Sequence, residues 1–138
     1  MLRIGRNLYV GISGRSNEAG IEQLRLALAP FGYRVAAVAM RDCLHLKSAC
    51  TFIPPEILLV NPAWVDPKLF DTRTVVAVDA SEAFAANTLT VQGVTLLSAA
   101  FPRTERRLRE AGITTRALDV SELQKAEAAL TCMSLMLD

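Results

Sequence analysis

The stretch that decides the fold is Cys50-Thr51-Phe52-Ile53-Pro54-Pro55-Glu56-Ile57-Leu58-Leu59-Val60, in which two short apolar runs flank a proline-containing turn. Runs of four such residues bounded by proline are typical of two paired strands. Asp66 before Pro67 predicts the capped start of a short helix. The apolar residues 74–78 then predict a third strand. The middle of the chain therefore predicts a strand–strand–helix–strand unit.

A similar unit precedes this one. Its three strands are predicted at residues 2–4, 8–12 and 33–40. Its helix is predicted at residues 18–29, with Asn17 as the N-cap and with Pro30 and Gly32 ending it. Apolar residues recur along this helix at a spacing that turns one face toward the core, namely Ile21, Leu24, Leu28 and Phe31.

A third unit follows, and one more strand closes the chain. The third unit has strands predicted at 88–91, 94–97 and 115–120, and a helix at 104–111. The closing strand is predicted at 131–137. When the first strands of the units are aligned, Cys132 takes the place of Ala49 and Thr88. Because the strands of successive propeller repeats start near a common axis, Cys132 is expected at that axis, near the segment that holds His45.

Length and composition favour a single domain with a sizeable core. The chain has 138 residues, of which 51% are hydrophobic, slightly above the usual fraction. This excess indicates either an unusually full core or apolar surface that contacts another chain. The net charge of +1 is spread over mixed charges, and aromatic residues are few, which argues against nucleic-acid binding. We find no apolar run long enough for a membrane span, and the charged residues 1–6 do not resemble a signal peptide.

Cysteine and histidine usage bounds the chemistry. An odd number of cysteines without framework spacing (Cys43, Cys50 and Cys132) favours reduced thiols in the cytoplasm. A single histidine and the absence of a CxxC pair argue against zinc, and we expect neither a metal nor a cofactor. A nucleophilic thiol needs a proton acceptor and donor, and histidine is the usual one. His45 and Cys132 are therefore the candidate catalytic pair.

Five short motifs carry a resemblance to a known family. They are Gly14-Arg15-Ser16-Asn17, His45-Leu46-Lys47-Ser48, Leu59-Val60-Asn61-Pro62, Phe101-Pro102-Arg103-Thr104 and Leu130-Thr131-Cys132. Together with the repeated units, their order and spacing resemble the C-terminal half of the dimethylarginine dimethylaminohydrolases, members of the pentein superfamily of guanidine-modifying enzymes. The resemblance implies an α+β fold of the α/β propeller type. In that fold five ββαβ units form a closed ring, and residues 1–138 would be a single partial domain with about three of them and a closing strand.

The resemblance also implies roles for individual residues. Cys132 would attack the guanidinium carbon of an N-ω-methylated arginine and form a covalent thiouronium intermediate. His45 would protonate the departing methylamine and then activate the water that releases citrulline. Arg15 would bind the substrate carboxylate, for which the guanidinium fork is well suited. Ala126 would hold the substrate amino group through its backbone carbonyl.

The sequence departs from the family pattern in two places. The family usually has a glycine just before its Leu-Thr-Cys motif, where this chain has Ala128-Ala129. The family's acidic residue that orients the histidine, and the carboxylates that grip the guanidinium, belong to the part of the ring that precedes Met1. We therefore expect a partner that completes the open ring, either a second copy of the chain or a separate N-terminal half. The sequence is also compatible with a fragment of a longer protein.

Three other functions stay open at this point. Arginine deiminases and amidinotransferases share the nucleophile and the histidine, so an enzyme of that kind with another guanidine substrate is the first alternative. A catalytically incomplete half-chain that acts as a subunit or is a fragment is the second alternative, and a small-molecule binding domain without turnover is the third.

For the remaining residues of note we expect supporting roles beside His45 for Lys47 and Ser48, a solvated helix face for Glu105-Arg106-Arg107, and packing roles for Cys43, Cys50, Trp64, Phe70 and Phe101.

Overall fold

The computed structural model describes residues 1–135 and confirms the three repeated units. Each unit has one three-stranded sheet, in which the first two strands pair antiparallel and the third lies parallel to the second. The strands of the first unit are β1 (Leu2–Ile4), β2 (Asn7–Ile12) and β3 (Arg34–Ala39). Those of the second are β4 (Cys50–Ile53), β5 (Ile57–Val60) and β6 (Thr74–Ala77). Those of the third are β7 (Leu89–Val91), β8 (Val94–Ser98) and β9 (Thr115–Leu118).

A helix connects the second and third strands of each unit, as predicted. These are α1 (Glu18–Leu28) followed by the turn η1 (Ala29–Phe31), the single turn η2 (Pro67–Leu69), and α3 (Pro102–Glu110). The side chain of Asn17 accepts a hydrogen bond from the Gly20 N–H, and the side chain of Asp66 accepts one from the Lys68 N–H, so both predicted N-caps are confirmed. Gly32 ends the first helical segment in the left-handed conformation, with φ 73°.

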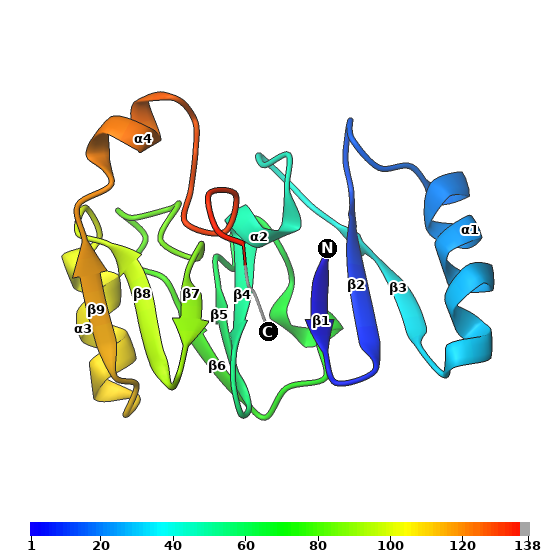
Figure 1. The fold of residues 1–138 in the computed structure, drawn as a ribbon, viewed down its shortest axis with the longest axis horizontal. Coiled ribbons are helices and arrows are strands. Elements are labelled where there is room, and N and C mark those ends of the chain that lie inside the picture. Colours follow the sequence, from blue (N-terminus) through cyan, green and yellow to red (C-terminus); the bar gives the residue numbers. More distant parts are fainter. Residues whose placement is uncertain (136–138) are drawn as a thin grey trace.

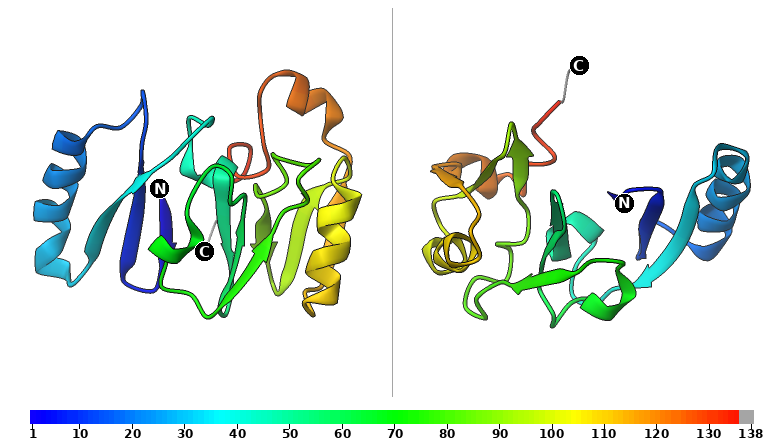
Figure 2. Two further views of the ribbon diagram at one scale, coloured as in Figure 1. Left: turned by 180° about the vertical axis from the view of Figure 1, so that it is seen from behind. Right: turned by 90° about the horizontal axis from the view of Figure 1, so that it is seen from below.

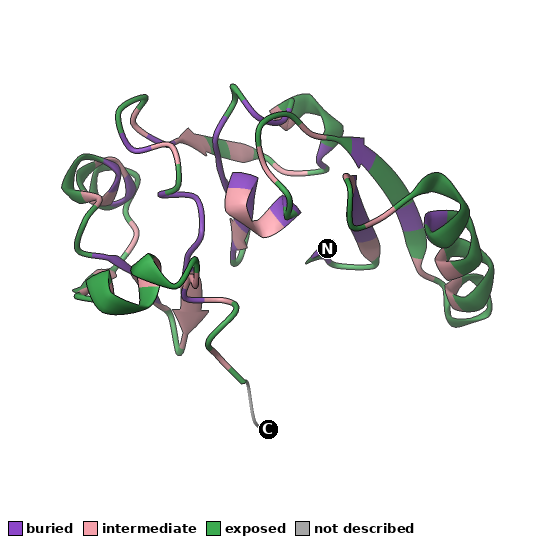
Figure 3. Ribbon diagram, turned by 90° about the horizontal axis from the view of Figure 1, so that it is seen from above, coloured by how far each residue is buried: buried purple, intermediate pink, exposed green. Residues whose placement is uncertain are grey.

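The three units lie side by side in an open arc (Figures 1 and 2). The first strands of neighbouring units contact one another, β1 beside β4 and β4 beside β7. Viewed from above, α1 and α3 lie at the two ends of the arc, and the described end of the chain lies on its concave side (Figure 3). The arrangement is an α+β fold of small mixed sheets with few helices.

The core is divided into clusters that join adjacent units. Strand β5 is buried along its whole length, and successive side chains point to opposite faces of a strand. Accordingly Leu58 and Val60 pack with residues of the first unit, whereas Ile57 and Leu59 pack with residues of the third. The continuous apolar run at 57–60 thus lets one strand contribute to two interfaces, and a further cluster lies between α1 and its own sheet.

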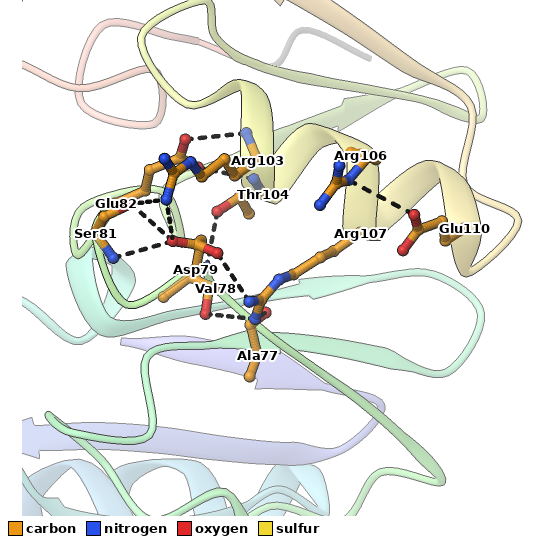
Figure 4. A network of polar contacts seen from close by, with 10 residues as sticks. All are labelled: Ala77, Val78, Asp79, Ser81, Glu82, Arg103, Thr104, Arg106, Arg107 and Glu110. Atoms are coloured by element: carbon orange, nitrogen blue, oxygen red, sulfur yellow. Dashed lines mark hydrogen bonds and ion pairs between the residues drawn. The ribbon is translucent and has the colours of Figure 1, made fainter.

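A polar network connects the second unit to the third (Figure 4). The carboxylate of Glu82 accepts hydrogen bonds from the backbone N–H groups at the start of α3, at Arg103 and Thr104. In return the Thr104 hydroxyl accepts a hydrogen bond from the Asp79 N–H at 3.0 Å. The Arg107 guanidinium donates to the Asp79 carboxylate at 2.8 Å and to the carbonyl of Val78 at 3.0 Å. The loop after β6 therefore caps the helix of the next unit.

The structure corrects the prediction of a closing strand at 131–137. Over the described part of that range the chain forms turns, because the N–H groups of Cys132 and Met133 both donate to the Ala129 carbonyl. Residues 136 and 137 lie outside the described residues. Cys132 consequently does not occupy a first strand equivalent to those of the earlier units, and its predicted position at the start of such a strand is wrong.

Several smaller predictions also differ from the structure. Phe31 is 66% exposed and does not pack against the core, because the chain has left the α-helix and entered the turn η1 before reaching it. Helix α3 begins two residues earlier than predicted, at Pro102. The run 105–107 is only partly solvated, since Arg107 is half-buried in the network around Asp79. Two short helices were not predicted, α2 (Leu46–Ala49) and α4 (Ser121–Lys125).

Candidate active site

A cavity of about 750 Å³ lies among segments from the second and third units. Its lining comes from residues 42–45 and 48, from residues between 84 and 101, and from residues between 120 and 130. The loop before α2, helix α4 and the segment that follows α4 all lie at the same end of the molecule, at the top of Figure 1.

His45 lines this cavity as the N-cap residue of α2. The short helix is fixed because Leu46 and Ala49, three residues apart on one face, are fully buried in the core between the first two units. The His45 carbonyl accepts a hydrogen bond from the Ser48 N–H at 2.9 Å, while the imidazole caps no backbone N–H of the helix. His45 is thus an exposed residue that its backbone holds at the cavity.

Cys132 follows in sequence a segment that lines the same cavity. Residues 127–130 form part of the lining, and Leu130 is buried, whereas the Cys132 thiol is exposed. Thr131 connects the two and is hydrogen bonded to the side chain of Asn87, which also lines the cavity. The structure thus places the segment that leads into Cys132 at the same cavity as His45, although Cys132 itself is not among the lining residues.

Arg15 lies at a different cavity. It is exposed in the turn after β2, where its N–H donates to the Ser13 hydroxyl at 3.1 Å. This turn and the start of α1 line a separate hollow of about 460 Å³. Ala126, the C-cap residue of α4, is exposed and lies between Gln124 and Glu127, which both line the larger cavity. The structure therefore brings His45 near the segments of Cys132 and Ala126, but it does not place Arg15 in their cavity.

The charges around the larger cavity are acidic. Asp42 and Glu127 line it, and no lysine or arginine of the part that the structure describes does so. Both carboxylates are exposed, so their effect is a modest negative potential rather than a buried charge pair. Such a lining favours a cationic ligand over an anionic one.

The three cysteines differ in their environment. Burial raises the pKa of Cys50 to about 12, and this thiol is fully buried in the core. Burial also raises the pKa of Cys43, with a further contribution from the negative charge of Asp42. A raised pKa keeps a thiol protonated and unreactive at neutral pH. Cys132 is the exposed cysteine among the three, and none of them forms a disulfide within residues 1–135.

Residues 1–135 contain neither a metal-binding cluster nor a membrane-spanning helix. No cluster of three or more histidine, cysteine or acidic side chains there could hold a metal ion. No helix in that range combines the length and the apolar character needed to cross a bilayer.

Sequence reasoning missed parts of the cavity wall. Helix α4 carried one local signal, since Asp119 stands two residues before Ser121 and its carboxylate accepts the Ser121 N–H at 3.0 Å. The single-turn helix α2 is too short for its periodicity to be visible. The family's glycine before the Leu-Thr-Cys motif is absent from this chain. The left-handed conformation that glycine adopts most readily is found there at Glu127, with φ 58°, and not at Ala128 or Ala129.

Comparisons with known proteins confirm the resemblance over the whole chain. No family model matches the sequence. The chain is 38% identical to the N(G),N(G)-dimethylarginine dimethylaminohydrolase of Streptomyces coelicolor over 139 aligned positions, which cover 99% of this chain and 52% of that enzyme. It is also similar to a crystal structure of the Pseudomonas aeruginosa enzyme, a cysteine-to-serine mutant complexed with citrulline. That match has a TM-score of 0.83 and 25% identity, and it covers 96% of this chain and 52% of the other.

A third comparison shows the fold in a related enzyme. The N-terminal domain of a cyanobacterial arginine dihydrolase, a mutant bound to its substrate, matches with a TM-score of 0.76 at 21% identity, over 95% of this chain and 51% of that one. The chain therefore shares its fold with enzymes of the pentein superfamily. It spans about half the length of the curated relatives that it matches.

Proposed function

We propose that this chain forms the nucleophile-bearing half of a dimethylarginine dimethylaminohydrolase-like enzyme, which converts N-ω-methylated arginines to citrulline and methylamines. The observation that carries the proposal is the acidic cavity lined both by His45 and by the segment that leads into Cys132. The 38% identity to a dimethylarginine dimethylaminohydrolase over 99% of the chain supports the choice of substrate class.

The proposed reaction proceeds in two steps. The Cys132 thiolate attacks the guanidinium carbon, so that a C–S bond forms, and the C–N bond to the methylated nitrogen breaks as His45 donates a proton to the leaving amine. Water then gives a proton to His45 and attacks the same carbon, the C–S bond breaks, and citrulline leaves with the thiolate restored. One histidine serves as acid and then as base because both steps need a proton carrier at the same place.

Arg15 and Ala126 complete the proposed substrate site. Arg15 would hold the substrate carboxylate in a bidentate contact, and the Ala126 carbonyl would accept a hydrogen bond from the substrate amino group. Arg15 lines a separate hollow, so the motif, and not the larger cavity, supports its assignment to the substrate carboxylate.

The proposal includes a partner that completes a five-unit ring. Exposed apolar side chains lie on α1, at Leu26, and on α4, at Leu123. A buried guanidinium also needs more carboxylate partners than the two exposed ones at this cavity. The partner is either a second copy of this chain or a separate chain with the remaining units. Sedimentation at micromolar concentration tests this part, and a monomer that neither self-associates nor binds another chain contradicts it.

The test of the activity is citrulline release from asymmetric dimethylarginine by the purified 138-residue chain, with Cys132→Ser and His45→Gln as controls. We expect turnover that both substitutions abolish. Faster turnover of arginine than of dimethylarginine would overturn the substrate assignment in favour of an arginine deiminase. Absence of turnover with both substrates, including after addition of the partner, would show instead a half-chain without catalysis.

A further inference from the structure

Asn87 makes a set of contacts that the proposed mechanism does not use. It lies in the loop before β7 and its side chain is 9% exposed. The side-chain Nδ2 donates to the Thr131 hydroxyl at 3.0 Å and to the Lys47 carbonyl at 3.1 Å, and the Oδ1 accepts the Thr131 N–H at 3.1 Å. A single buried amide therefore joins the segment of Lys47 to that of Thr131.

These contacts are the polar attachment of the segment that carries Cys132. Within the described part of the chain, the hydrogen bonds of residues 129–135 stay inside that segment, except for the two that join Thr131 to Asn87. The other anchor is the buried side chain of Leu130. Without Asn87, the segment would keep its own turn but would lose its hydrogen bonds to the rest of the fold.

The two residues that Asn87 contacts are close in sequence to the candidate catalytic pair. Thr131 immediately precedes Cys132, and Lys47 belongs to the single-turn helix α2 whose N-cap is His45. We infer that Asn87 is a positioning residue, which holds the His45 helix and the Cys132 segment at a fixed separation. The catalytic importance of Asn87 rests on the proposed function. The hydrogen bonds by which Asn87 holds the Cys132 segment do not depend on that function.

The chemistry of the amide explains why asparagine suits this place. The two N–H groups on Nδ2 donate to the Thr131 hydroxyl and the Lys47 carbonyl, and Oδ1 accepts from the Thr131 N–H. A carboxylate or a hydroxyl cannot supply two donors and one acceptor together. Aspartate would bring a negative oxygen against the Lys47 carbonyl. Alanine would leave the carbonyl and the Thr131 N–H without partners in a buried place.

The direct test is amide hydrogen exchange of Thr131 in the 138-residue chain. We expect Asn87→Ala to speed exchange of this amide by about tenfold, as the loss of one hydrogen bond would give. Thr131→Val is a milder change and should speed exchange of this amide less, because only the hydroxyl contact is lost. Thr131→Ser keeps the hydroxyl and should exchange at the wild-type rate. The matched control is Asn61→Ala, since Asn61 is also buried and bonded through its amide, to the Ala83 carbonyl and the Ala63 N–H.

Activity provides the second readout. If wild type turns over dimethylarginine, Asn87→Ala should lower kcat by about 10- to 100-fold with little change in KM, because misalignment of reacting groups affects the transition state more than binding. An unchanged Thr131 exchange rate in Asn87→Ala, or an equal acceleration in Asn61→Ala, overturns the inference. If wild type shows no turnover even after the partner is added, the proposed function of this chain fails, and the exchange rates alone decide whether Asn87 holds the segment.

Discussion

Glu82 caps the helix of the following unit through Thr104: its carboxylate oxygen accepts the Thr104 N–H at 2.7 Å (Figure 4). The other oxygen accepts the Arg103 N–H at 2.9 Å, so one carboxylate satisfies two N–H groups at the start of α3. Helix N-termini favour such negative groups. In most helices the cap comes from the residue before the helix, whereas here Phe101 stands in that position and a distant loop provides the cap.

The first prediction concerns this cap. Glu82→Ala should lower the free energy of unfolding by about 1–2 kcal/mol, because it removes a buried cap from two backbone donors. Glu82→Gln keeps one acceptor oxygen and should lose about half as much. Urea denaturation followed by circular dichroism measures both. Glu122→Ala, at an exposed residue of α4, is the control and should change stability by less than about 0.5 kcal/mol; an equal loss there would contradict the prediction.

The second prediction is an acid sensitivity at Asp79. Hydrogen bonds from the Ser81 hydroxyl and N–H, together with the charges of Arg107 and Arg103, lower the pKa of the Asp79 carboxyl. A group whose pKa is lower in the folded state stabilises the fold above its unfolded pKa, near about 3.9 for aspartate, and this contribution disappears as pH falls through the folded value.

Unfolding experiments between about pH 6 and pH 2 should therefore show a stability loss that is shallower in Asp79→Asn than in wild type. The variant should already be less stable at neutral pH, since Arg107 then lacks its ionic partner. Parallel stability curves for the two proteins would show that Asp79 makes no contribution to the pH dependence.

The third prediction ranks the thiols. With iodoacetamide at about pH 8, Cys132 should react first, Cys43 more slowly and Cys50 only after unfolding, because thiolate content and exposure control the rate. Burial holds the Cys50 pKa near 12, above its unfolded value, so its contribution to stability is complete below the unfolded pKa and is lost as pH rises through the folded one. Peptide mass spectrometry identifies the modified residue, and early labelling of Cys50 would contradict its burial.

The fourth prediction concerns the left-handed residue beside the cavity. Glu127 has φ 58°, a conformation that costs most residues about 1 kcal/mol and glycine almost nothing. Glu127→Gly should therefore leave the melting temperature unchanged or raise it. Ala128→Gly, one residue later and without a positive φ, should lower it. The reverse order in differential scanning fluorimetry would place the strained residue elsewhere.

The fifth prediction follows from the acidic lining. Removing both charges, with Asp42→Asn and Glu127→Gln together, should raise KM for dimethylarginine by roughly 3- to 10-fold, since exposed carboxylates contribute little each. The difference from wild type should shrink as salt is added, because screening weakens both proteins' attraction for the cation. Steady-state kinetics at low and high ionic strength measures this, and an unchanged KM at low salt would argue against a cationic ligand near these two residues.

Local signals in the sequence were sufficient for most of the fold. The strands at 50–53 and 57–60, the caps at Asn17 and Asp66, and the order of the three units are confirmed, because each depends on neighbouring residues alone. The prediction of a closing strand at 131–137 also depended on neighbouring residues alone, and it was wrong. Its apolar run satisfies strand propensity, yet a strand also needs a sheet edge beside it, and the Ala129 carbonyl turns the chain first.

The candidate site was predictable only in part. Motifs identified His45 and Cys132, and the structure brings His45 and the segment before Cys132 to one cavity. Arg15 was assigned by motif alone, and nothing local could indicate that its turn lines a separate hollow. Asn87 and Glu82 carried no sequence signal, since their partners lie more than twenty residues away and depend on how the units pack.

The division of the core by strand β5 has a consequence for how the molecule opens. The core clusters that join units in residues 1–135 lie between neighbouring units, as in a short linear array, in which local stability depends on the number of interfaces a unit shares. The central unit shares two, through Leu58 and Val60 on one side and Ile57 and Leu59 on the other, whereas each outer unit shares one. Thermal fluctuations should therefore detach an outer unit while the central one persists. A partner that covers both ends of the arc would give each outer unit a second interface, and the three units would then unfold as one cooperative body.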